Sequence, residues 1–111
     1  MLNQDYKEML LLLIEEEVDF VLVGAYALAA HGFPRATGDI DIFVKPSSGN
    51  AHNVYRSLAK FGAPLEGVSI EDFSSPGVIF QIGVAPMRID ILTAIDSVSF
   101  QEAIQDAIIA V

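Results

Sequence analysis

Two aspartates lie two residues apart inside an apolar segment, Thr37-Gly38-Asp39-Ile40-Asp41-Ile42-Phe43-Val44. A β-strand directs residues i and i+2 to the same face, so the carboxylates of Asp39 and Asp41 are expected on one face and the isoleucines on the other. Two carboxylates this close repel each other, and burying them beside a core is unfavourable unless a cation or hydrogen bonds compensate their charge. A divalent metal ion is the simplest such cation.

A third aspartate occurs in a similar setting, Arg88-Ile89-Asp90-Ile91-Leu92. If this strand neighbours the first one, opposed side chains come within about 5 Å at Cβ and three carboxylates converge. Oxygen ligands of this kind suit Mg²⁺ or Mn²⁺, with water and substrate phosphates completing the coordination. Two such ions about 4 Å apart can stabilise the attacking and leaving oxygens of a phosphoryl displacement. The alternative is that these aspartates only face solvent on half-buried strands.

The turn at Gly24-Ala25 is a candidate phosphate site. It follows a β-branched and aromatic run, 18–23, and precedes a segment rich in helix formers, 25–30. A strand, a glycine and then a helix leave free backbone N–H groups at the helix N-terminus, which bind phosphate without a basic side chain. Taken alone, the same pattern also fits an ordinary strand–helix turn.

These motifs together resemble a known superfamily. The stretch from Gly24 to Asp41 reads Gly-x-Tyr-Ala-x-x-x-His-Gly-x-x-Arg-x-Thr-x-Asp-x-Asp, and Arg88-Ile89-Asp90-Ile91-Leu92 follows later in the chain. This combination resembles the nucleotidyltransferase superfamily with the polymerase-β-type fold. More narrowly, it is similar to the minimal nucleotidyltransferases of abortive-infection and toxin–antitoxin systems. The resemblance extends from Phe20 through the segment 99–111.

The resemblance implies a metal-dependent transfer of a nucleotidyl group from an NTP to a hydroxyl on RNA, protein or a small molecule, with release of pyrophosphate. Asp39 and Asp41 would bind two Mg²⁺ or Mn²⁺ ions that also hold the NTP. Asp90 would bind the catalytic ion and help to deprotonate the acceptor hydroxyl, while the Gly24-Ala25 backbone would hold the terminal phosphates. A cognate antitoxin or a second copy of the chain is the expected protein partner.

Other residues near the acidic strand have less specific expectations. Arg35 and Lys45 flank the strand and either could contact phosphate, although Arg35 could equally pair with an aspartate. Thr37 could bind the nucleotide or stabilise its own loop by hydrogen bonding. The family usually has Gly-Gly or Gly-Ser where this chain has Gly24-Ala25, and it commonly continues into a C-terminal helical region. A catalytically degenerate binding module in a toxin–antitoxin or regulatory complex is therefore the second hypothesis, and an acidic metal-binding domain is the third.

Composition limits the remaining possibilities. The chain has 111 residues, of which 52% are hydrophobic and 19% charged, which predicts a single ordered domain, 1–111. Cysteine is absent, so disulfides and thiolate metal sites are excluded. The formal net charge of −9 argues against a broad electrostatic grip on nucleic acid, so a phosphate-bearing ligand has to meet a local positive site. With no basic leader and no apolar run near about 20 residues, a cytoplasmic protein without a membrane partner is expected.

The hydrophobic pattern predicts an α/β (α+β) fold with a small mixed sheet of about four strands and helices packed on one face. The metal site is expected on the exposed face, at the ends of the strands 39–45 and 88–93. We expect Asn50 to cap a helix that ends at Gly62, a helical turn near 70–73, and a capping box at Ser99 and Glu102. The apolar stripe of the helix 99–111 continues to the last residue, so either the protein continues past it, which we expect, or the helix packs against the protein at its very terminus. The predicted elements are a helix with the apolar face Tyr6, Met9, Leu10, Leu13 and Ile14, the strands 18–23, 39–45, 78–82 and 88–93, and the helices 25–30, 50–61 and 99–111.

Overall fold

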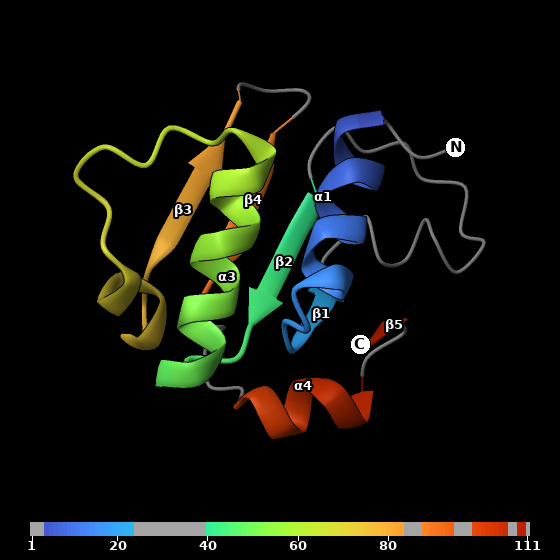
Figure 1. Cartoon of the computed structure of the whole chain (residues 1–111). Helices are drawn as coiled ribbons and strands as arrows, with labels where there is room; N and C mark the ends of the chain where they lie inside the picture. The colour runs from blue at the N-terminus through green and yellow to red at the C-terminus, as the bar shows by residue number, and fades with distance from the viewer. Residues whose placement is uncertain (1–3, 24–39, 84–87, 95–98, 107–108, 111) are drawn as a thin grey trace.

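A five-stranded mixed sheet forms the centre of the molecule. The computed structural model describes residues 4–23, 40–83, 88–94, 99–106 and 109–110. The strand order is β3-β4-β2-β1-β5, in which β2 and β4 are parallel and the other neighbours antiparallel (Figure 1). The predicted α+β class with a mixed sheet is confirmed. The strands are β1 (Phe20–Val23), β2 (Ile40–Val44), β3 (Ile79–Ile82), β4 (Ile89–Leu92) and β5 (Ile109–Ala110).

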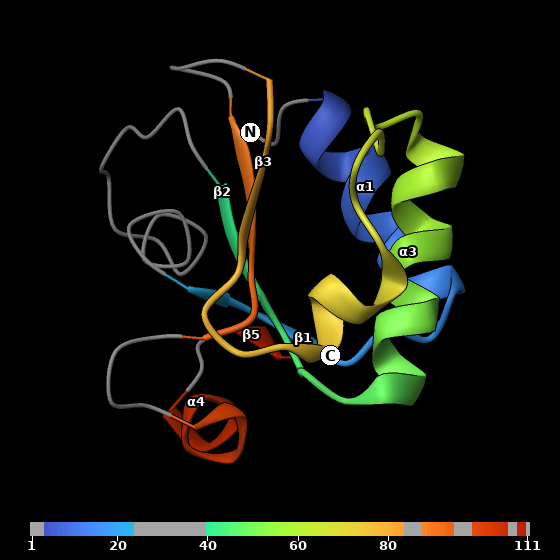
Figure 2. The same ribbon diagram turned by 90° about the vertical axis from the view of Figure 1, so that its left-hand side faces the viewer.

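The helices cover both faces of this sheet. Helices α1 (Gln4–Glu15) and α3 (Ser48–Phe61) and the 3₁₀ turn η1 (Ile70–Ser74) lie on one side, and α4 (Phe100–Asp106) lies on the other side (Figure 2). The expectation that the helices pack on one face is therefore wrong for α4. None of the helices in the described part of the chain is long and apolar enough to cross a bilayer.

Alternation along the central strands produces two apolar clusters, one on each face. Phe43 of β2 faces α4 and packs with Val21, Phe100 and Ala103. The larger cluster lies under α1 and α3, and the predicted face of α1 contributes to it, except that Ile14 is 49% exposed. Its buried members from the strands are Phe20, Leu22, Ile40, Ile42, Val44, Ile89 and Ile91.

Helices α1 and α3 end in the same backbone motif. At the end of α3, the Ala63 N–H donates to the Leu58 carbonyl and the Gly62 N–H donates to the carbonyls of Leu58 and Ala59. Gly62 has φ of 91°, as predicted for a C-terminal cap. The corresponding residue of α1 is Glu17, which has φ of 60°, and Val18 donates there to the Leu13 carbonyl.

Opposite changes at these two equivalent positions are expected to have opposite effects. Gly62→Ala should destabilise the protein by about 1 kcal/mol, because alanine is strained at positive φ. The new Cβ would meet nothing within 4 Å, so no clash contributes. Glu17→Gly should stabilise the protein by about 0.5–1 kcal/mol for the same reason. Urea unfolding measures both, and a Gly62→Ala variant as stable as the wild type would contradict the explanation.

The N-terminus of α3 differs from the prediction. Ser47, not Asn50, is the capping residue, since its Oγ accepts a hydrogen bond from the Asn50 N–H at 3.3 Å. The Asn50 side chain is buried and points away from the helix axis toward the strands, where it bonds the backbone of Asp19 and Lys45. Ser47 precedes the helix by one residue and has an extended backbone, which is the geometry a cap requires.

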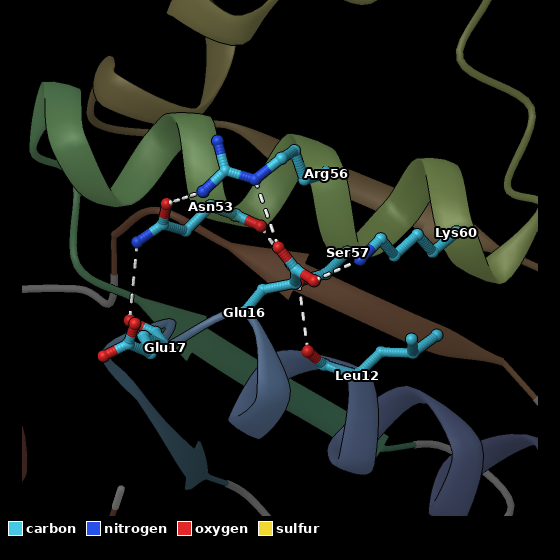
Figure 3. A network of polar contacts seen from close by, with 7 residues as sticks. All are labelled: Leu12, Glu16, Glu17, Asn53, Arg56, Ser57 and Lys60. Carbon is cyan, nitrogen blue, oxygen red and sulfur yellow. Dashed lines mark hydrogen bonds and ion pairs between the residues drawn. The ribbon is translucent and has the colours of Figure 1, made fainter.

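An ion-pair network joins α1 to α3 (Figure 3). The carboxylate of Glu16 is 13% exposed and accepts hydrogen bonds from Lys60 Nζ at 2.5 Å and Arg56 Nε at 3.1 Å. Donation from Lys60, and then from Arg56, holds the pKa of Glu16 below its ordinary value of 4.5. Ser57 adds a bond from its Oγ to the Leu12 carbonyl at 3.5 Å. The network therefore fixes how α1 lies against α3.

This network predicts a pH-dependent contribution to stability. Because the pKa of Glu16 is lower in the folded protein than in the unfolded chain, its stabilisation is present above the unfolded pKa and is lost as pH falls through the folded pKa. Glu16→Gln should therefore unfold at a lower temperature than the wild type at neutral pH, and the two midpoints should converge in acid. Glu15→Gln, at an exposed neighbour, is the control. A gap between wild type and Glu16→Gln that stays constant into acid would contradict this account.

The C-terminal segment is only partly helical. The predicted capping box is present: the Ser99 N–H donates to Glu102 Oε1 and the Glu102 N–H donates to Ser99 Oγ, both at 3.1 Å. The first of these bonds lowers the pKa of Glu102. The helix ends at Asp106, however, and Ile109–Ala110 pair with β1, so the expected helix to residue 111 is wrong. Pairing satisfies backbone groups at an edge of β1 that a longer helix would leave open.

Candidate functional site

Asp41 and Asp90 lie directly opposite each other on neighbouring parallel strands. The register pairs Ile40 with Ile89, Asp41 with Asp90 and Ile42 with Ile91. Because these isoleucines belong to the cluster under α1 and α3, the two aspartates face the other side of the sheet. The prediction that the strands 39–45 and 88–93 are neighbours is confirmed. Asp41 and Asp90, two of the three predicted metal ligands, therefore lie on the same face of the sheet in adjacent strands.

Asp90 is buried and paired with Arg88, the residue that directly precedes β4. Its side chain is 8% exposed and that of Arg88 is 30% exposed. Arg88 Nε donates to Asp90 Oδ1 at 2.8 Å, and Nη2 donates to Oδ2 at 3.1 Å. This two-pronged contact is the strong geometry for an arginine and a carboxylate. This pairing was not predicted from the sequence; the signal for it is the separation of two residues, which directs both side chains of an extended segment to the same face.

The backbone of Arg88 anchors this end of the sheet. Its carbonyl accepts hydrogen bonds from the Ile40 N–H at 3.0 Å and from the Tyr6 hydroxyl at 3.3 Å. The start of β4 is therefore tied both to the start of β2 and to α1. The backbone of Arg88 thus holds the start of β4 in place, and its side chain compensates the charge of Asp90. Asp41 is half-buried beside this pair.

The carboxylates remain suited to a metal ion despite the arginine. Each carboxylate oxygen has two lone pairs, so the two bonds from Arg88 leave Asp90 acceptor capacity. Asp41 and Asp90 supply oxygen ligands from one face, which Mg²⁺ and Mn²⁺ prefer. Among the residues that the structure describes, no group of three histidines, cysteines or acidic residues that could hold a metal ion is found.

The other predicted site residues divide into two groups. Lys45 lies at the far end of β2 from Asp41, about 13 Å along the strand, where it lines a surface hollow. Five residues lie outside the described part of the chain, so their roles stay predictions: Gly24, Ala25, Arg35, Thr37 and Asp39.

The positions of two of these residues in the sequence relate them to the aspartate pair. The last residue of β1, Val23, pairs with Asp41, and Gly24 follows it directly in the sequence. Asp39 directly precedes Ile40, the first residue of β2. Both predicted segments thus adjoin residues that lie at the same end of the sheet as Asp41 and Asp90.

Comparisons of the chain with protein-family models, with curated proteins and with solved structures give no match.

Proposed function

We propose that this protein is a metal-dependent nucleotidyltransferase, which transfers a nucleotidyl group from an NTP to a hydroxyl acceptor and releases pyrophosphate. The observation that carries the proposal is the register of β2 and β4, which opposes Asp41 to Asp90 on one sheet face. The motif of residues 24–41 supports it, since Asp39 is the third acidic residue and Gly24-Ala25 directly follows Val23, which pairs with Asp41. The polymerase-β-type fold is part of the same proposal.

The proposed roles follow from the placement of the carboxylates. Asp39, Asp41 and Asp90 would hold Mg²⁺ or Mn²⁺, which supplies charge neutralisation for the phosphates and lowers the pKa of the acceptor hydroxyl. Asp90 would accept the hydroxyl proton, and Arg88 would keep its carboxylate in position through the two bonds described above. The parallel strands fix the separation of the two carboxylates before substrate binds, so positioning is the main contribution of the protein.

One observation favours a second function, a nucleotide-binding module without turnover. Arg88 compensates the buried charge of Asp90 within the protein itself, so the fold does not need a metal ion to tolerate this carboxylate. A degenerate site that acts in a toxin–antitoxin or regulatory complex would have the same arrangement.

Transfer of label from α-³²P-NTPs tests the proposal. Each of the four NTPs is incubated with this protein in the presence of Mg²⁺ or Mn²⁺. Cellular RNA and cellular proteins are added as acceptors. Wild type should label an acceptor, and Asp41→Asn and Asp90→Asn should each lower the rate by about a thousandfold or more. The control is Glu66→Gln at an exposed position, which should not change the rate.

Titration calorimetry with Mg²⁺ and non-hydrolysable NTPs separates the two functions. Metal-dependent binding without labelling supports the binding module. If no NTP binds and none labels any acceptor, both nucleotide proposals are wrong.

A further inference from the structure

Strand β3 lies at one edge of the sheet (Figure 1). It pairs with β4 along one side, and no strand in the described part of the chain pairs with its other side. Its exposed side chains are Ile79, at 62% exposure, and Gln81. Natural edge strands avoid pairing with other chains through charged side chains, prolines or bulges. The residues 79–82 contain no charge and no proline, and their register with β4 has no bulge, so this edge is open to pairing.

The backbone groups of Ile79 and Gln81 point to the free side of β3. In an antiparallel ladder, alternate residues direct both their N–H and their C=O toward the partner strand. Val78 does so, since its carbonyl accepts from the Thr93 N–H at 3.0 Å and its N–H donates to Thr93 Oγ1 at 2.8 Å. Ile79 and Gln81 are one and three residues further along, so each offers a donor and an acceptor at the free edge.

The extended part of β3 has a glycine at the same distance on either side of its centre. Gly77 and Gly83 have φ of 84° and 83°, which ends an extended strand on both sides. Phe80 lies midway between them. Two copies of the segment 78–82 can therefore pair antiparallel along its whole length, about a two-fold axis at Phe80. A shift of the register would bring one of the glycines into the pairing and shorten it.

In this register the side chains of two copies are compatible on both faces. On the face toward α3, Val78 lies opposite Ile82 of the second copy and Phe80 lies opposite its counterpart, and all of these side chains are apolar and half-buried. On the other face Ile79 lies opposite Gln81, and each such pair exchanges two backbone hydrogen bonds. Aromatic and β-branched pairs of this kind stabilise antiparallel strands.

The distribution of charge favours a second copy at this edge. The chain has a formal net charge of −9, so two copies repel each other unless they meet where charge is absent. No charged residue occurs between Asp72 and Arg88, a stretch that includes β3 and the two glycines beside it. Two copies can therefore pair through β3 without bringing like charges directly together.

We propose that β3 pairs with β3 of a second copy, so that the two molecules share one continuous sheet. Opposed side chains point to the same face, so α1 and α3 of both copies lie on one side and both pairs of Asp41 and Asp90 lie on the other. A single pair of short strands buries less than the roughly 1,200 Å² of a stable complex, so the dimer should form at concentrations of about 10–100 µM. The proposal does not rest on nucleotidyl transfer, because the pairing uses only the edge of β3.

Sedimentation equilibrium over a range of protein concentrations tests the proposal. Wild type should change from monomer to dimer, and Gln81→Pro should weaken the dimer about tenfold or more, because proline removes an N–H that points to the free edge. The bonds of β3 to β4 do not use this N–H, so the variant should keep the circular dichroism spectrum of the wild type. Leu11→Gln removes a 51% exposed apolar side chain from α1 and should dimerise as the wild type does.

A second variant, Ile79→Lys, keeps every backbone donor. Ile79 is exposed, so the variant should fold normally, and a lysine on an edge strand should weaken the dimer about tenfold or more. It reduces the net negative charge, so a weaker dimer would not come from greater repulsion between the copies. A wild type that stays monomeric up to about 1 mM, or a dimer that neither variant weakens, would overturn the proposal.

Disulfide cross-linking tests the register, since the chain has no cysteine of its own. Copies with Ile79→Cys are mixed with ¹⁵N-labelled copies with Gln81→Cys, and mass spectrometry identifies the mixed dimers. Opposed residues of a bonded pair have Cα atoms about 5.5 Å apart, within the range of a disulfide. Mixed dimers should therefore form about tenfold faster than dimers of Leu11→Cys copies. Equal rates would overturn the proposed pairing.

Discussion

Arg88→Met is expected to lower the free energy of unfolding by about 3 kcal/mol, because it leaves the buried carboxylate of Asp90 without its charged partner. The Asp90 side chain is only 8% exposed, so water replaces the two bonds from the guanidinium poorly. Methionine keeps much of the apolar stem, which limits the packing loss. Urea unfolding measures the change. Arg56→Met is the matched control: Arg56 is 55% exposed and its removal should cost far less.

The double variant Arg88→Met/Asp90→Asn identifies the cause of this loss. If the uncompensated carboxylate is responsible, removing its charge should restore most of the stability. Mg²⁺ should also stabilise the single variant more than the wild type, since an ion that binds only the folded state raises its stability. A double variant as unstable as Arg88→Met would assign the loss to other contacts of Arg88.

Asn50→Leu should also cost about 3 kcal/mol, because one side chain joins three separate segments. Asn50 Oδ1 accepts from the Asp19 N–H at 2.7 Å, and Nδ2 donates to the carbonyls of Asp19 at 3.0 Å and Lys45 at 2.9 Å. Asn50 is 6% exposed, so leucine would leave these backbone groups without partners. The thermal midpoint should fall by roughly 12 °C or more. Asn53→Leu, on the same helix, is the control and should have a much smaller effect.

Asn50→Asp distinguishes lost hydrogen bonds from altered packing. Aspartate has nearly the same shape and retains an acceptor for the Asp19 N–H, but it places an oxygen against the carbonyls of Asp19 and Lys45. The variant should therefore be destabilised at neutral pH and should partly recover in acid, where the carboxyl becomes a donor. Wild-type stability of Asn50→Asp at neutral pH would contradict the role of the Nδ2 bonds.

Local patterns predicted the elements well where one physical preference dominated. Gly62 ends α3 because positive φ strains other residues, and Ser99 with Glu102 begins α4 because each satisfies a backbone N–H of the other. The alternation in Ile40-Asp41-Ile42 assigned the two faces of β2 correctly, because a strand repeats every two residues. In each of these cases the residues that determine the structure lie within a few positions of one another in the sequence.

The predictions from the sequence were wrong where segments distant in the chain compete for the same surface. The apolar run at the C-terminal end fits a helix stripe, but the structure gives Ile109 and Ala110 to the free edge of β1. Asn50 has the composition of a helix cap, but its partner Asp19 is 31 residues away in the sequence. Helix α4 packs on the second sheet face because Phe43 and Val21 need cover there.

The candidate site shows the same division. The sequence by itself determined that Asp41 and Asp90 each lie on a strand between isoleucines, on the face opposite to those isoleucines. It also placed Arg88 within reach of Asp90, two residues away. Only the tertiary structure decided that β2 and β4 are parallel neighbours in a register that opposes the two carboxylates. Strand pairing depends on which edges remain available after the whole sheet and its helices have packed, and no local pattern contains that information.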